Sequence, residues 1–280
     1  MDKRLAGKYE ALRKKIGGYV GAGITVAFSG GVDSALLCKV ACMEAGAAHP
    51  VYAVTVQTRL HPAKDLEEAR QAAEEFGALH RALQINELAE SGMENNPVNR
   101  CYLCKKSIFG KIKELAQEFG AGVVLEGTNA DDLLEYRPGI QAVKELQIFS
   151  PLAECGLTKA EIRELAAHLD IPAANRPSVP CLATRLPYGT RISYELLGRI
   201  DEGERYLRGL GFYNVRLRVH EWTDGDKKEA GRWLARIEVD AEDISRLLVH
   251  RKELTNKVKN LGFDLVTVDL EGFRSGSMDG

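Results

Sequence analysis

The feature that most constrains this chain is a short glycine-rich loop, residues 29–34, with the sequence SGGVDS. The run ITVAF at residues 24–28 precedes the loop and is rich in β-branched residues, and a helical pattern follows over residues 32–45. A buried strand that enters a helix through such a loop directs backbone N–H groups and the positive end of the helix dipole at one point. We therefore expect the loop to bind a phosphate group.

The loop departs from the two commonest phosphate motifs. No lysine precedes Ser34, as the pattern GxxxxGK[ST] requires, and GxGxxG is absent as well. Gly30 and Gly31 let the backbone approach an anion closely, and the hydroxyls of Ser29 and Ser34 add donors. Asp33 cannot favour a bare phosphate, so we expect it to cap the helix or to hold Mg²⁺. The alternative is an ordinary glycine-rich turn between a strand and a helix.

Strand and helix patterns alternate along residues 1–172 and predict an α/β domain. Buried strand patterns lie at residues 24–28, 51–56, 79–85 and 123–125. Helical patterns lie at residues 5–16, 32–45, 62–76, 102–119 and 158–169, the last with a capping box formed by Thr158 and Glu161. Elements of this length in alternation favour parallel βαβ units with helices on both faces of the sheet.

A second, smaller domain is expected after a proline-rich segment. Residues 171–190 contain four prolines and little periodicity, so we interpret residues 173–192 as an active-site loop and linker. Beyond it, the patterns predict a helix at 193–209, strands at 213–220 and 233–239, a long helix at 241–260 and a last strand at 265–270. This order indicates a small α+β domain over residues 193–280, which we expect to bind substrate and to mediate oligomerisation.

Charge and hydropathy exclude several classes of protein. The 38 Lys and Arg residues nearly balance the 40 Asp and Glu residues, which weakens the case for a dedicated nucleic-acid-binding protein. No stretch approaches the roughly 20 apolar residues that a membrane-spanning helix requires. The first residues mix charges with apolar positions at helical spacing and lack the apolar core of a secretory signal. We expect a cytoplasmic protein with no membrane and no nucleic-acid partner.

Six cysteines, at positions 38, 42, 101, 104, 155 and 181, are expected to bind a metal, to take part in catalysis or to be buried, because a reducing cytosol disfavours disulfides. Cys38 and Cys42 are four residues apart on the helix after the glycine-rich loop, which favours a packed helix face. Cys155 has no evident partner and is interpreted in the same way.

Cys101 and Cys104 form a CxxC just before a helix, with three cations around it that favour thiolate or cluster sulfide. The pattern leaves three interpretations open: half of a zinc site, a redox pair or part of an iron–sulfur site. Cys181 stands alone in the proline-rich segment, followed by Arg185 and Arg191. Three thiolates can hold a [4Fe–4S] cluster and leave the fourth iron open to another ligand.

Five segments occur in a fixed order: SGGVDS, NPxxRCYxCK, EGTNADD, CLATRLPYGTRIS and RSGSMD, which begin at residues 29, 96, 126, 181 and 274. With these segments the sequence resembles the LarE family over nearly the whole chain. The resemblance implies a PP-loop ATP pyrophosphatase fold, which is adenine nucleotide alpha hydrolase-like, over residues 1–172. It also implies that ATP adenylates the carboxylates of pyridinium-3,5-biscarboxylic acid mononucleotide, which then become thiocarboxylates. That step lies on the way to the nickel-pincer nucleotide, the cofactor of lactate racemase.

The family uses two sources of sulfur. One type donates the sulfur of a cysteine in the CLASR-like loop and is left with dehydroalanine, while the other holds a [4Fe–4S] cluster on three cysteines. Cys101, Cys104 and Cys181 match the cluster type, in which the open iron is thought to carry hydrosulfide, although sacrifice of the Cys181 sulfur stays an alternative. Thr184 departs from the family, because the loop more often has serine there. The resemblance further implies a sulfide or other sulfur donor, handover of product to the nickel-inserting enzyme and a homo-oligomer.

The expected site residues fall into four groups. The catalytic group is Cys101, Cys104, Cys181 and Arg185. The ATP-binding group is Ser29, Gly30, Gly31, Val32, Asp33, Ser34, Thr55 and Gly127. The substrate phosphate is assigned to Arg216 and Arg218, because alternate residues of a strand point to one face. The candidates for Mg²⁺ are Asp33, Glu126, Asp131 and Glu204. Solvated charge is the alternative for the two arginines and for Glu126, Asp131 and Glu204.

Three other functions compete with this interpretation. A tRNA thiolase shares the loop and the cysteine chemistry, but it should show a basic face with aromatic platforms for RNA. An amide-forming ligase of the NAD synthetase kind would need no cysteine trio. A non-catalytic nucleotide or cluster sensor would release neither AMP nor pyrophosphate.

Overall fold

The computed structural model describes residues 1–61, 65–134, 137–172, 180–222, 232–274 and 277–278. It divides into two compact units. Unit 1 comprises Met1–Thr58, Ala63–Gly92 and Asn99–Val179, and unit 2 comprises Arg59–Pro62, Met93–Val98 and Pro180–Gly280. Parts of three predicted segments lie outside the described residues, namely 62–64 of a helix, 173–179 of the proline-rich loop, and 275–276 with 279 of the ending RSGSMD.

Unit 1 is built on a four-stranded parallel sheet, as the alternation of strands and helices predicts. Its strands are β1 (Ile24–Ala27), β2 (Val51–Gln57), β3 (Leu79–Gln84) and β4 (Val123–Leu125). The order across the sheet is β3-β2-β1-β4, with Val26 opposite both Ala53 and Leu125. The predicted α/β class is therefore confirmed.

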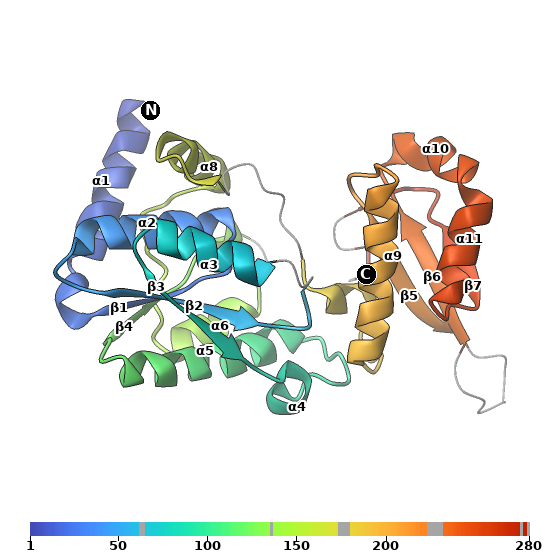
Figure 1. Cartoon of the computed structure of the whole chain (residues 1–280), viewed down its shortest axis with the longest axis horizontal. Coiled ribbons are helices and arrows are strands. Elements are labelled where there is room, and N and C mark those ends of the chain that lie inside the picture. The colour runs from blue at the N-terminus through green and yellow to red at the C-terminus, as the bar shows by residue number, and fades with distance from the viewer. Residues whose placement is uncertain (62–64, 135–136, 173–179, 223–231, 275–276, 279–280) are drawn as a thin grey trace. The chain divides into compact units, whose positions relative to one another are not determined.

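Helices cover both faces of this sheet (Figure 1). One face carries α1 (Lys3–Gly17), α2 (Val32–Ala45), α3 (Asp65–Glu75), the short α7 (Pro151–Glu154) and α8 (Lys159–His168). The other carries α5 (Arg100–Glu118) and α6 (Gly139–Glu145), and α4 (Glu87–Ser91) contacts α5. Each face has its own apolar core, represented by Leu36 and Ile162 on the first and by Phe109 and Ile112 on the second.

The strand order creates a switch point between β1 and β4. From β1 the chain proceeds to β2 and β3 on one side, whereas β4 pairs with the other edge of β1. Ligands of open α/β sheets bind beyond the carboxyl ends of strands at such a point. The loop at 29–34 follows β1 and the EGTNADD segment at 126–132 follows β4, so both lie at this switch point.

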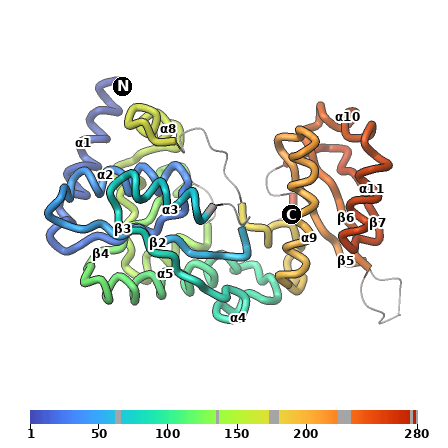
Figure 2. The backbone as a smooth tube through the Cα atoms, in the orientation of Figure 1, coloured from blue at the N-terminus to red at the C-terminus, as the bar shows by residue number. Residues whose placement is uncertain are grey.

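Unit 2 contains a three-stranded sheet of β5 (Arg216–Trp222), β6 (Arg232–Glu238) and β7 (Leu265–Val268), of which β5 and β6 are antiparallel and β6 and β7 are parallel. Helix α9 (Tyr194–Gly209) packs on β5, and α11 (Arg251–Asn260) packs on β7 (Figure 2).

The long helix that the sequence predicts at 241–260 is interrupted. It consists of a 3₁₀ turn (Ala241–Asp243), α10 (Ile244–Val249) and α11. The break is at His250, whose N–H donates to the carbonyl of Leu247 three residues back, and whose ring packs edge-on against Phe212. The apolar pattern in the sequence could not predict this break. The same face of the helix stays apolar before and after the one residue that leaves the helical hydrogen-bond pattern.

Within the described residues, no helix combines the length and apolar character that crossing a membrane would require.

Candidate active site

The glycine-rich loop closes on itself through its two serines. The backbone N–H of Ser29 donates to Oγ of Ser34 over 3.2 Å, and that hydroxyl donates to the carbonyl of Gly31 over 3.0 Å. Gly31 is the N-cap of α2, and Gly30 has a φ of 74° in the left-handed region that favours glycine. The loop therefore presents backbone donors at a helix N-terminus in a fixed conformation.

Gly127 brings the loop after β4 against the first turn of α2. A Cβ atom at this position would lie 3.1 Å from Cβ of Asp33 and 3.2 Å from the backbone N of Ser34. A side chain here would be in tighter contact than is usual, so glycine allows the close approach. The structure thus places Gly127 beside the SGGVDS loop, as the sequence predicts for one site. Thr55, another of the expected ATP-binding residues, lies on β2. Its hydroxyl is 2.9 Å from Nε2 of His80, and burial lowers the pKa of the His80 imidazole.

Two of the Mg²⁺ candidates, Asp33 and Asp131, contact Lys159, which is not among the residues expected from the sequence. Nζ of Lys159 forms an ion pair with Oδ2 of Asp33, and the backbone N–H of Lys159 donates to Oδ2 of Asp131 over 2.7 Å. The amide of Asn129 lies 3.5 Å from Oδ1 of Asp33 and accepts from the N–H of Asp131 over 3.0 Å. Lys159 is the first residue of α8, where a cation opposes the helix dipole. This unfavourable position of a lysine is the feature of the sequence that could have indicated a role for Lys159.

Glu126 is buried and organises the segment that follows β4. Its carboxylate accepts hydrogen bonds from the backbone N–H and the hydroxyl of Thr128, at 3.0 and 2.9 Å, and from the hydroxyl of Ser150. Nζ of Lys105, which follows the CxxC on α5, lies 3.8 Å from Oε2 of Glu126. Glu126 thus links the cysteine-bearing helix to the loop that contains Gly127.

Cys101 and Cys104 lie near the start of α5, with the first thiol exposed and the second half-buried. Residues three apart on a helix share a side, so the start of α5 offers two sulfur donors to one ligand. None of the six cysteines, all within described ranges, forms a disulfide. Across the part of the chain that the structure describes, no three His, Cys, Asp or Glu side chains are grouped to hold a metal ion.

In unit 2, Cys181 is the N-cap of a 3₁₀ helix at Leu182–Arg185 and is half-buried. Its carbonyl accepts from the backbone N–H and the hydroxyl of Thr184, at 3.1 and 2.8 Å, and from Nη1 of Arg185 at 3.3 Å. Serine at position 184 could donate the same hydroxyl bond, so the departure from the family preserves this contact. Three hydrogen bonds, two from Thr184 and one from Arg185, therefore hold the backbone that carries the Cys181 thiol.

Arg185 and Glu204 form an ion pair in which both side chains are 0% exposed. Nε and Nη2 of Arg185 donate to the two carboxylate oxygens over 2.7 and 3.0 Å, and Glu204 also accepts from Arg208 and from the backbone N–H of Leu217. Burial alone would raise the pKa of Glu204, but the hydrogen bond and charge of Arg185, with the backbone hydrogen bond of Leu217 and the charge of Arg208, together outweigh it and the pKa is lowered. As observed, Arg185 holds the Cys181 loop to α9.

The two arginines of β5 have different surroundings. Nε of Arg218 donates to Glu238 over 3.1 Å and Nη1 donates to the carbonyl of Thr184 over 2.9 Å, so this side chain also fixes the Cys181 loop. Arg216 stacks on Phe273 with 4.8 Å between guanidinium and ring centre, and it forms no ion pair with any carboxylate among the described residues. Burial, reinforced by the charge of Arg185, lowers the pKa of Arg216 to about 10.

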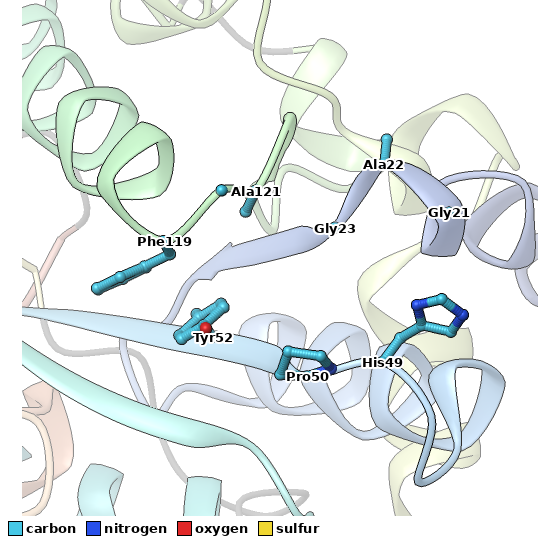
Figure 3. Close-up of a pocket in the computed structure, with 9 residues that line it drawn as sticks. Gly21, Ala22, Gly23, His49, Pro50, Tyr52, Phe119 and Ala121 are labelled. Carbon is cyan, nitrogen blue, oxygen red and sulfur yellow. The ribbon is translucent and has the colours of Figure 1, made fainter.

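A pocket of about 220 Å³ lies at the opposite end of the sheet in unit 1 (Figure 3). Its lining includes Gly23, Pro50 and Ala121, each just before a strand, and the rings of Tyr52 and Phe119, which stack with centres 4.3 Å apart. The pocket therefore faces the amino ends of the strands, whereas ligands of such sheets bind at the carboxyl ends.

Comparison with known proteins agrees with this geometry. Residues 21–136 match the family model described as Asparagine synthase. A Synechocystis sp. protein named "Uncharacterized protein slr1717" is 40% identical over 98% of both chains. The pyridinium-3,5-bisthiocarboxylic acid mononucleotide synthase of Lactiplantibacillus plantarum is 34% identical over 91% of this chain and 88% of that one. A third relative, "Uncharacterized protein MJ0830" of Methanocaldococcus jannaschii, is 32% identical over 90% of this chain and 91% of its own.

The matched segment holds β1, the SGGVDS loop, α2 and β4, which are the elements that form the switch point, and the likeness to the synthase extends over both units. The resemblance seen in the sequence is confirmed, and the chain belongs to the LarE family.

Proposed function

We propose that this protein is an ATP-dependent sulfurtransferase that adenylates the carboxylates of pyridinium-3,5-biscarboxylic acid mononucleotide and converts them to thiocarboxylates. The observation that carries the proposal is the SGGVDS loop, held by Ser34 and Gly127 at the switch point of a parallel sheet without a Walker lysine. The full-length likeness to a bisthiocarboxylic acid mononucleotide synthase supports the choice of substrate.

In the first half-reaction, backbone N–H groups of residues 29–34 and the hydroxyls of Ser29 and Ser34 bind the phosphates of ATP. A substrate carboxylate oxygen forms a bond to the α-phosphorus, the bond from that phosphorus to the bridging oxygen breaks, and pyrophosphate leaves. Asp33 and Asp131 are proposed to hold Mg²⁺, which offsets charge on the leaving group. Glu126 and Glu204 are weaker candidates for this role, because their oxygens already accept several hydrogen bonds within the chain.

In the second half-reaction, a sulfur nucleophile attacks the acyl adenylate carbonyl and AMP leaves. Cys101, Cys104 and Cys181 are proposed to hold a [4Fe–4S] cluster, which when bound supplies an iron with an open position for hydrosulfide. Arg185 and Arg218 fix the backbone of Cys181. Arg216 lacks a carboxylate partner among the described residues and is proposed, with Arg218, to receive the substrate phosphate.

The proposal includes partners on the grounds of family membership. The reaction consumes a small-molecule nucleotide and sulfide or another sulfur donor, and its product would pass to a nickel-inserting enzyme. A cytoplasmic homo-oligomer is proposed on the same family grounds.

The test is to incubate the protein with ATP, Mg²⁺ and the dicarboxylate mononucleotide and to measure AMP, pyrophosphate and product mass. We expect AMP and pyrophosphate in equal amounts, and a product in which sulfur replaces oxygen. Release of neither would favour a nucleotide or cluster sensor and overturn the proposal. Thiolation of tRNA in place of the mononucleotide would identify the rival thiolase.

Protein purified without oxygen is expected to show broad visible absorption, because a [4Fe–4S] cluster on three thiolates absorbs there. The absorption should be lost in Cys101→Ser, Cys104→Ser and Cys181→Ser and retained in Cys155→Ser, whose half-buried thiol packs against the core of unit 1. Colourless protein that becomes lighter by one hydrogen sulfide after turnover would contradict the cluster and support sacrifice of Cys181.

A further inference from the structure

We propose that Lys159 supplies the phosphate-binding cation that the SGGVDS loop itself lacks, and that Asp33 holds this lysine beside the loop until ATP and Mg²⁺ bind. The inference rests on the proposed use of ATP and adds to it a residue from outside the loop. On binding, Asp33 exchanges the ammonium for Mg²⁺, and Nζ of Lys159 moves to the phosphates.

The contacts place the ammonium at the loop. Nζ of Lys159 pairs with Oδ2 of Asp33, a residue 126 positions earlier in the chain and in the first turn of α2. The side chains of Lys159 and Asp33 are 34% and 21% exposed, so solvent or a ligand can reach the pair. Ion pairs of this exposure contribute little to stability, so a bound anion can displace the aspartate at small cost.

The backbone of Lys159 is held independently of its side chain. Its N–H donates to Asp131, and the preceding Thr158 forms the capping box with Glu161. Lys8 of α1 in turn donates to both carboxylate oxygens of Glu161 over 2.7 and 2.6 Å. The ammonium can therefore change partner while the start of α8 stays in place.

Two other cations that the structure describes in this part of unit 1 also pair with carboxylates, but with neither Asp33 nor Asp131. Lys105 lies 3.8 Å from Glu126, and Arg137 lies 2.7 Å from Asp132. A triphosphate that arrives between Asp33 and Asp131 meets two carboxylates, so it requires positive charge in addition to backbone N–H groups. A cation in the first turn of a helix is unfavourable unless an anion lies beside it, and the carboxylate of Asp33 supplies that anion until ATP binds.

The test compares Lys159→Met with Lys159→Arg and with Lys15→Met, in the full chain. Lys15 is a matched control, because its ion pair with Glu154 has a lysine of the same 34% exposure and neither residue belongs to the site. We expect Lys159→Met to weaken ATP binding or pyrophosphate release about tenfold to a hundredfold, as loss of a charge-assisted hydrogen bond implies. Lys159→Arg should retain part of the ATP binding or pyrophosphate release that Lys159→Met loses. Lys15→Met should match the wild type in both measurements.

A second measurement distinguishes direct contact of Lys159 with phosphate from an indirect role in which Lys159 only positions Asp33. In an Asp33→Asn background without Mg²⁺, the affinity for a non-hydrolysable ATP analogue is measured with and without Lys159→Met. A further loss on removing the lysine supports direct contact with phosphate. Equal affinities, or wild-type ATP kinetics in Lys159→Met, would overturn the inference. Failure of the wild type itself to bind ATP would instead refute the proposed function.

Discussion

Cys181→Ser is expected to abolish thiocarboxylate formation while adenylation of the substrate continues. The hydroxyl that replaces the thiol is neither a cluster ligand of comparable softness nor a competent sulfur donor, so either sulfur source fails. The loop should keep the three hydrogen bonds that end on the backbone carbonyl of residue 181, because the substitution changes only the side chain. Mass spectrometry should therefore detect the acyl adenylate without the thiocarboxylate.

Cys155→Ser is the control for this result, since Cys155 is also half-buried but lies in unit 1 without a predicted role in the reaction. Thiocarboxylate formation by Cys181→Ser at the wild-type rate would remove Cys181 from the proposed mechanism. Loss of adenylation together with sulfur transfer would show that residue 181 serves the first half-reaction as well.

Arg185→Met should destabilise unit 2 by up to about 3–5 kcal/mol, because it removes one partner of a fully buried ion pair and leaves Glu204 with the partly exposed Arg208 as its remaining cation. Both tryptophans of the chain, Trp222 and Trp233, lie in unit 2, so their fluorescence during urea unfolding reports on this unit. Arg199→Met is the control on the same helix. Its exposed pair with Glu195 should contribute less than about 1 kcal/mol. Similar midpoints for the two variants would contradict the assigned importance of the buried pair.

The same ion pair predicts the direction of a pH effect. Because the pKa of Glu204 is lowered in the folded protein, its contribution is fully present above the ordinary carboxyl pKa of about 4.3. This contribution to stability is lost as the pH falls from about 4.3 through the lowered pKa of Glu204. In Arg185→Met the hydrogen bond and charge that most lower the pKa of Glu204 are removed while burial, which raises it, remains, so acidification should narrow the stability difference between this variant and the wild type. Unfolding midpoints from pH 7 downward would measure the difference.

Local patterns in the sequence were enough to predict the sheet and the phosphate loop. The run at 24–28, the glycines at 30 and 31 and the helix from residue 32 are neighbours in sequence, so their structure depends on nearby residues. The capping box at Thr158 and Glu161 is likewise present in the structure. Short helices such as α6 and α7 were not predicted, since seven and four residues are too few to display a period.

The long-range parts of the site could not be predicted in this way. Arginine and glutamate are usually exposed, so nothing in the local sequence indicates that Arg185 and Glu204 bury each other completely. The role of Lys159 depends on a carboxylate in another βαβ unit, and only the fold brings the two together. Family resemblance suggested which residues to consider, but it did not give their contacts.

Helix α1 precedes the first strand and belongs to no βαβ unit, yet its Lys8 holds the capping glutamate of α8. The segment that matches the asparagine synthase model, residues 21–136, contains neither helix. A minimal fragment designed around that segment would keep every glycine of the phosphate loop and lose the lysine beside it. A fragment designed to keep Lys159 and the contacts that support the start of α8 should therefore extend from α1 to α8.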